Sequence, residues 1–108
     1  MPSEIAPRAL AARLAAGAPT FLLDVREPWE HALVVLGNST LLPLGELPAR
    51  HRELRVPPGA LVVTYCHHGV RSLSAASFLL EQGWTDVTSL AGGVDAWVIE
   101  VDSTLARY

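Results

Sequence analysis

The segment from residue 60 to residue 83 constrains the fold more than any other part of the chain. Residues 60–66 (ALVVTYC) form a short apolar run rich in β-forming side chains, and a Pro-Pro-Gly breaker precedes them. Four residues later, residues 71–83 (RSLSAASFLLEQG) place apolar side chains at helical spacing and end on a glycine. A buried strand that leads this quickly into an amphipathic helix predicts a βα unit.

Strand and helix patterns alternate along the whole chain. We expect further strands over 20–25, at the end of 36–43 and over 86–90, and helices over 6–16, 27–34 and 94–101, with a weak helical stretch over 44–54. No composition break, charge block or repeat divides the sequence, so we predict a single domain over residues 1–108. The alternation predicts an α/β fold with a mainly parallel sheet and helices on both faces.

Composition and charge exclude several classes of protein. The single cysteine, Cys66, cannot form an internal disulfide or a cysteine-rich zinc site. A net charge of −3 argues against nucleic acid as a partner. No apolar run approaches the roughly 20 residues that cross a bilayer, and the first residues lack the pattern of a signal peptide. We therefore expect a cytoplasmic protein with no membrane partner and one free thiol.

The residues around that thiol form the strongest candidate site. Cys66 ends the best predicted strand, where ligands bind in parallel α/β sheets. In the segment 66–72, here called the Cys66 loop, Gly69 permits the positive φ that lets neighbouring backbone amides converge on an anion. The following helix N-terminus and Arg71 add positive charge. We expect this field to favour the thiolate, which is the nucleophilic form of cysteine.

Alternatives stay open for each member of the loop. Cys66 could be an ordinary buried thiol, because free cysteine is often buried. The side chains of His67 and His68 could orient an anionic donor or be solvated. Arg71 could contact an anion or bond loop carbonyls. Ser72 is expected to act as a helix cap or to satisfy the loop.

Residues outside the loop receive structural interpretations. Asp24 and Arg26, at the end of another strand, could brace the rim of the site, but a structural ion pair is the favoured interpretation. His31 and His51 lie on polar helical segments and are expected at the surface. We predict no metal site, because adjacent histidines chelate poorly and no second Cys/His pair is nearby. Core packing is the expected role of the three tryptophans, Trp29, Trp84 and Trp97.

From about residue 20 onwards the chain resembles a single-domain rhodanese of the rhodanese-like sulfurtransferase family. The residues that carry the resemblance are, in chain order, Asp24-Val25-Arg26-Glu27-Pro28, Leu42-Pro43-Leu44, Val62 to Ser72, Ala75-Ala76, Leu79, Gly83-Trp84 and Leu90 to Trp97. The resemblance implies a three-layer α/β/α fold around a five-stranded parallel sheet. It also implies a catalytic cysteine, Cys66, which accepts a sulfane sulfur as a persulfide and passes it on.

The resemblance implies further partners and ligands. The donor is expected to be a small molecule such as thiosulfate, or a protein persulfide, and the acceptor a thiol or cyanide; no cofactor is implied. The expected substrate-binding residues are those that follow Cys66, namely His67, His68, Gly69, Val70, Arg71 and Ser72. Because the chain has no second thiol, a persulfide on Cys66 must pass its sulfur to an external acceptor.

Two features qualify this interpretation. Rhodanese-like chains usually carry Gly-His-Ile-Pro-Gly-Ala where this chain has Val34 to Ser39, so the turn geometry there is open. Related cysteine phosphatases and arsenate reductases have one residue more between cysteine and arginine, and Ser72 stands where a phosphatase needs its arginine. The shorter loop favours sulfur over phosphate. A non-catalytic sulfur carrier or docking module is the other alternative.

Overall fold

The computed structural model describes residues 2–108 and contains a five-stranded sheet in which all paired strands are parallel. The strands lie in the order β1-β5-β4-β2-β3. Their bounds are β1 (Ser3–Ile5), β2 (Thr20–Asp24), β3 (Thr40–Leu41), β4 (Leu61–Tyr65) and β5 (Val87–Leu90). The central strand β4 pairs with β2 and β5 along its length, which places the residue that follows it, Cys66, in the middle of one edge of the sheet.

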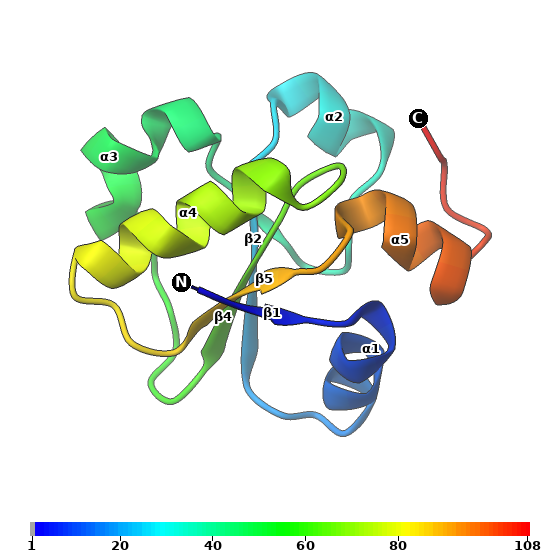
Figure 1. Cartoon of the computed structure of the whole chain (residues 1–108), viewed down its shortest axis with the longest axis horizontal. Coiled ribbons are helices and arrows are strands. Elements are labelled where there is room, and N and C mark those ends of the chain that lie inside the picture. Colours follow the sequence, from blue (N-terminus) through cyan, green and yellow to red (C-terminus); the bar gives the residue numbers. More distant parts are fainter. Residues whose placement is uncertain (1) are drawn as a thin grey trace.

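Helices cover both faces of this sheet. Their bounds are α1 (Pro7–Ala15), α2 (Pro28–Leu33), α3 (Leu47–Arg50), α4 (Val70–Glu81) and α5 (Gly93–Glu100), with 3-10 turns at Leu44–Glu46 and His51–Glu53. In Figure 1, α1 and α5 are neighbours at one side of the sheet, and α3 and α4 are neighbours at the other. No helix within residues 2–108 is long and apolar enough to cross a membrane.

Alternating side chains of the central strands feed two separate cores. Leu22 and Val63 join Leu10 of α1 and Val94 of α5 in one buried cluster. Their neighbours along the strands point the other way and belong to the second cluster, with Leu79 of α4. Because successive side chains of a strand face opposite sides, apolar runs such as residues 60–66 are what a sheet covered on both faces requires. Cys66 belongs to the α4 side.

The predicted α/β architecture is confirmed, and the differences lie at element ends. The strand β1 was not predicted, because three residues at a sheet edge are too few to show an alternation of apolar and polar side chains. The expected strand within 36–43 shrinks to β3, and Gly92-Gly93 is a turn only in part, because Gly93 already begins α5. The helix α4 begins at Val70, one residue before the predicted start, because Gly69 is its N-cap with φ of 97°.

The surface and packing assignments of three side chains are corrected. His51 is buried, and its Nδ1 accepts a hydrogen bond from the indole N–H of Trp84 at 3.3 Å. His31 is half-buried against the carboxylate of Asp24. Trp29 is 61% exposed and contacts the ring of Tyr108 edge-on. The polar residues that flank His51 in the sequence therefore led to a wrong prediction of its exposure. A histidine can be buried when another group satisfies its ring nitrogen.

The expected ion pair between Asp24 and Arg26 is present and fully buried. The guanidinium donates to both carboxylate oxygens at 2.8 Å. It also donates to the carbonyls of Glu30 and Val34 and, at 3.0 Å, to the hydroxyl of Tyr108. The segment 34–39, where the family's usual histidine and proline are missing, is therefore fastened to the end of β2 by the carbonyl of Val34. One guanidinium, that of Arg26, thus connects the end of β2 with α2 and with the residue that follows α2.

Arg26→Met should destabilise the fold by about 3 kcal/mol, because it leaves the Asp24 carboxylate buried without its principal partner. The matched control is Arg50→Met, which removes an arginine whose ion pairs with Glu46 and Glu53 are exposed. It should cost less than about 1 kcal/mol. Urea unfolding of both variants measures the difference. Equal losses would show that burial of the Asp24–Arg26 pair does not set its contribution.

Candidate active site

The sulfur of Cys66 lies directly after β4 and accepts hydrogen bonds from two backbone amides. Its Sγ is 3.1 Å from the N of Gly69 and 3.3 Å from the N of Ser72, and the residue is 1% exposed. The thiol also lies 3.5 Å from Oγ of Ser72. Both amides belong to the N-terminal end of α4, where backbone N–H groups lack helical acceptors and carry partial positive charge. The arrangement stabilises negative charge on the sulfur.

Gly69 makes this convergence possible. Its φ of 97° reverses the chain between β4 and α4, a conformation that side chains with a Cβ adopt rarely. A Cβ at this position would also lie 3.1 Å from the backbone N of Gly92. The positive φ expected at Gly69 is confirmed, although sequence reasoning placed the start of the helix one residue too late.

The N-terminal end of α5 holds the other side of the same loop. The amide of Val94 donates to the carbonyl of Cys66 at 2.8 Å, and the amide of Asp95 donates to that of His67 at 3.0 Å. A Cβ on Gly93, which has φ of 62°, would overlap both carbonyls. These bonds fix the orientation of the first two peptide planes of the loop, between Cys66 and His67 and between His67 and His68. Gly93 is a site residue that sequence reasoning treated only as part of a turn.

Ser72 lies inside the first turn of α4 rather than at its cap. Its hydroxyl shares a hydrogen bond with that of Ser89 at 2.7 Å, and its carbonyl accepts from the hydroxyl of Thr64 at 2.8 Å. All three residues are fully buried beneath Cys66. Ser72 therefore serves the site twice, through its amide and its hydroxyl, which confirms the loop-satisfying role and not the capping role.

Arg71 is paired with a carboxylate and, within residues 2–108, donates no hydrogen bond to a loop carbonyl. Its guanidinium forms a bidentate ion pair with Glu30 of α2, at 2.7 and 2.9 Å. The hydrogen bonds from Arg71 lower the pKa of Glu30 to about 2. The Tyr108 hydroxyl also donates to Glu30, at 2.6 Å, and burial together with that bond raises the pKa of Tyr108 to about 12. Glu30 and Tyr108 carried no sequence signal of their own, since the chain separates them by 78 residues.

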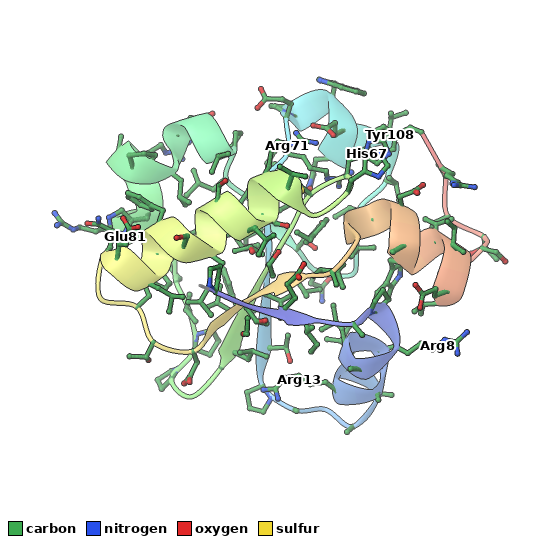
Figure 2. All side chains as sticks on the ribbon, in the orientation of Figure 1. Arg8, Arg13, His67, Arg71, Glu81 and Tyr108 are labelled. Atoms are coloured by element: carbon green, nitrogen blue, oxygen red, sulfur yellow. The ribbon has the colours of Figure 1, made fainter. Side chains whose placement is uncertain are left out.

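The two histidines and Val70 form the outer surface of the loop. The ring of His67 stacks between those of His68 and Tyr108, with centroids 3.9 Å away on each side. Figure 2 shows His67, Tyr108 and Arg71 gathered at the end of the loop, with Tyr108 arriving from the last segment of the chain. The Nε2 of His67 is buried without a partner within residues 2–108. His68 and Val70 are exposed.

The family model of the rhodanese-like domain matches residues 6–100. The chain belongs to the rhodanese-like domain family. A protein of Allochromatium vinosum named sulfurtransferase is 37% identical over 90% of this chain and 89% of its own length. The rhodanese fold also appears in a crystal structure of a rhodanese-related protein from Thermoplasma volcanium, with a TM-score of 0.80 and 29% identity over 92% of this chain and 93% of that one.

Relatives of this rhodanese-like chain support a transferase in general terms. The thiosulfate sulfurtransferase GlpE of Pseudomonas fluorescens is 36% identical over 70% of this chain and 68% of its own length. In other relatives the match spans about a quarter of a longer protein. Within residues 2–108 of this rhodanese-like chain, no group of three or more His, Cys, Asp or Glu side chains is placed to hold a metal ion.

Gly93→Ala should distort the Cys66 loop, because the added Cβ overlaps the carbonyls of Cys66 and His67. Gly83→Ala is the matched control, since Gly83 also has a positive φ, 98°, but no atom lies within 4 Å of its Cβ position. We expect the control to lose only about 1 kcal/mol of stability and Gly93→Ala to lose several times more. Urea unfolding and the rate of Cys66 alkylation measure both effects. Equal behaviour of the two variants would contradict the role of Gly93.

The ion pair between Glu30 and Arg71 predicts that the stability of the fold decreases at acidic pH. The pKa of Glu30 falls from about 4.5 to about 2 through its bonds to Arg71, so its contribution to stability is complete above pH 4.5 and is lost as the pH falls toward 2. The contribution should reach about 2–3 kcal/mol. Unfolding free energies of the wild type and Glu30→Gln should differ at pH 7 and converge near pH 2. A difference that is independent of pH would contradict this.

Proposed function

We propose that this chain is a sulfurtransferase in which Cys66 carries a sulfane sulfur as a persulfide. The observation that supports it best is the pair of backbone amides, from Gly69 and Ser72, directed at Sγ of Cys66. Fixed dipoles of this kind stabilise a thiolate before the reaction and a terminal persulfide sulfur after it, with little reorganisation. The family relationship and the relatives named sulfurtransferases agree with this chemistry.

The first half-reaction loads the sulfur. The Cys66 thiolate attacks the outer sulfur of thiosulfate or of a persulfide, a new S–S bond forms, and the old S–S bond breaks. Sulfite or a thiolate leaves with the electron pair of the broken bond. The second half-reaction reverses the roles, because an acceptor thiolate or cyanide attacks the terminal sulfur and Cys66 leaves as thiolate. This is covalent catalysis with ping-pong kinetics, and neither half requires a cofactor or a metal.

The main chain and Ser72 take the principal binding roles in this proposal. The amides of Gly69 and Ser72 and the Ser72 hydroxyl contact the reacting sulfur, whereas Arg71 is held by Glu30. The side chains of His67, His68 and Val70 line the approach rather than the sulfur. Because Cys66 is the chain's only cysteine, the acceptor is a separate molecule.

The short loop and the position of Arg71 argue against a phosphatase. Four residues separate Cys66 from Arg71, and the guanidinium forms a bidentate ion pair with the carboxylate of Glu30. A phosphate ester needs a ring of donors around several oxygens and a cation for its charge. Among residues 2–108, two amides donate to Sγ.

The decisive experiment is intact-mass measurement after incubation with a sulfur donor. Wild-type protein treated with thiosulfate or glutathione persulfide should gain the mass of one sulfur atom, and cyanide should remove it with release of thiocyanate. Cys66→Ser should gain nothing. Absence of the adduct with every donor would favour a non-catalytic docking module, and Cys66-dependent hydrolysis of p-nitrophenyl phosphate would favour a phosphatase.

A further inference from the structure

The charges around the Cys66 loop are compensated in pairs. Arg71 is neutralised by Glu30 through two hydrogen bonds. Behind it, Arg26 is neutralised by Asp24, and in front of α5, Arg107 is paired with Asp95 at 2.7 Å. His68, the exposed histidine of the loop, also lies 3.9 Å from Asp95. Each of the three guanidinium groups beside the loop thus has a carboxylate partner, and the backbone hydrogen bonds that reach the sulfur come from the amides at the start of α4.

Such a site treats two kinds of sulfur donor differently. Thiosulfate arrives as a dianion, is attacked by another anion, and releases sulfite as a dianion. Its reaction therefore gains most from a free cation near the sulfur. A persulfide of an organic thiol concentrates less charge at the reacting atoms, and its leaving group is a thiolate with a single charge. Two backbone amides and no unpaired guanidinium suit the second donor better.

The surface beside the Arg71–Glu30 ion pair carries exposed apolar side chains, which suit an organic donor. Val70 precedes Arg71 and is 74% exposed, and Trp29 precedes Glu30 and is 61% exposed. The Arg71–Glu30 ion pair links the start of α4 to α2, and each of these helices carries an exposed apolar side chain next to the pair in the sequence. The ring of Tyr108 contacts both Trp29 and His67. Exposed apolar and aromatic groups that gather at a reactive site mark a binding surface for an apolar group.

We propose that Glu30 is a specificity-determining residue, which engages the guanidinium of Arg71 in an ion pair, compensates its charge and thereby makes an organic persulfide the preferred donor over thiosulfate. Glu30 acts through Arg71 and does not touch the sulfur. The inference rests on the proposed function, because it concerns which donor loads Cys66. The Arg71–Glu30 ion pair would then influence the choice of donor as well as join α2 to α4.

The test uses Glu30→Gln, which keeps the shape of the side chain and removes its negative charge. The second-order rate constant for loading Cys66 is measured by quenched intact mass, with thiosulfate and with glutathione persulfide as donors. Wild type should load faster from the persulfide. In Glu30→Gln, Arg71 keeps its charge without a counter-charge, so the thiosulfate rate constant should rise about tenfold while the persulfide value changes little. A merely structural role would lower both values together.

Two control variants separate local from general charge effects. Glu53→Gln changes the net charge equally but lies on the exposed pair with Arg50, and it should leave both rate constants unchanged. The double variant Glu30→Gln/Arg71→Gln restores neutrality at the loop and should cancel the gain with thiosulfate. A gain that survives in the double variant, or an equal gain in Glu53→Gln, would overturn the role of the Arg71–Glu30 pair.

A measurement on unmodified protein guards against a variant that fails to fold. Without a free cation at the loop, the wild-type rate constant for thiosulfate should change little with ionic strength, whereas a steep fall on adding salt would contradict the inference. A persulfidated cysteine in an apolar peptide forms a further arm. Faster loading from this peptide than from glutathione persulfide assigns a protein-bound donor, and slower loading assigns a small-molecule donor.

The outcomes also separate this inference from the function on which it rests. If no donor adds sulfur to the wild type, the sulfurtransferase proposal fails. If both donors add sulfur but thiosulfate is preferred in the wild type and Glu30→Gln does not change its rate constant, the function stands and the role of Glu30 is wrong.

Discussion

The active-site geometry depends on two hydrogen bonds from the start of α5 to the carbonyls of Cys66 and His67. A peptide group cannot turn its carbonyl toward one helix without turning its N–H away from it. By fixing the first peptide planes of the loop, α5 aligns the chain so that Gly69 can reverse it and α4 can begin with its amides directed at the sulfur. Two helix N-termini therefore cooperate, one on the carbonyls of the loop and the other on its thiol. A parallel sheet makes this possible, because β4 and β5 are neighbours and both helices start at the same edge.

The second level of organisation is a chain of buried polar contacts from the end of β2 to the loop. Asp24 holds Arg26, and Arg26 contacts Tyr108 and the backbone of α2. Glu30 then joins Tyr108 to Arg71. Burying so many charged groups costs solvation free energy, which the network recovers because each group has partners of opposite charge or a hydrogen-bond donor. Consequently Tyr108, the second strand and the Cys66 loop form one connected unit around the candidate site.

Sequence reasoning found what local patterns determine. The apolar run before Cys66, the Gly69 reversal and the amphipathic period of α4 each depend on a few neighbouring residues, and the structure agrees with them. It failed where a side chain's role depends on residues distant in the sequence. The ion pair of Arg71 was not predicted because its partner, Glu30, is 41 residues away, and His51 appeared exposed because its partner, Trp84, comes later in the chain. The short edge strands β1 and β3 were missed or overextended since pairing with neighbours, not a period, defines them.

The Glu30 carboxylate contributes both to the stability of α2 and to the contacts around the candidate site. Its Oε1 accepts the backbone amide of Glu27, and the side chain of Glu27 accepts a backbone amide of the first turn in return, so the pair caps α2. The same carboxylate binds Arg71 and Tyr108. An anionic ligand that drew Arg71 toward itself would therefore leave Glu30 buried with less compensation and weaken the contact between α2 and α4. The amides at Sγ carry no such penalty, since they belong to the backbone and are already directed at the sulfur. A monovalent sulfur species fits what these amides can stabilise without disturbing the rest of the network.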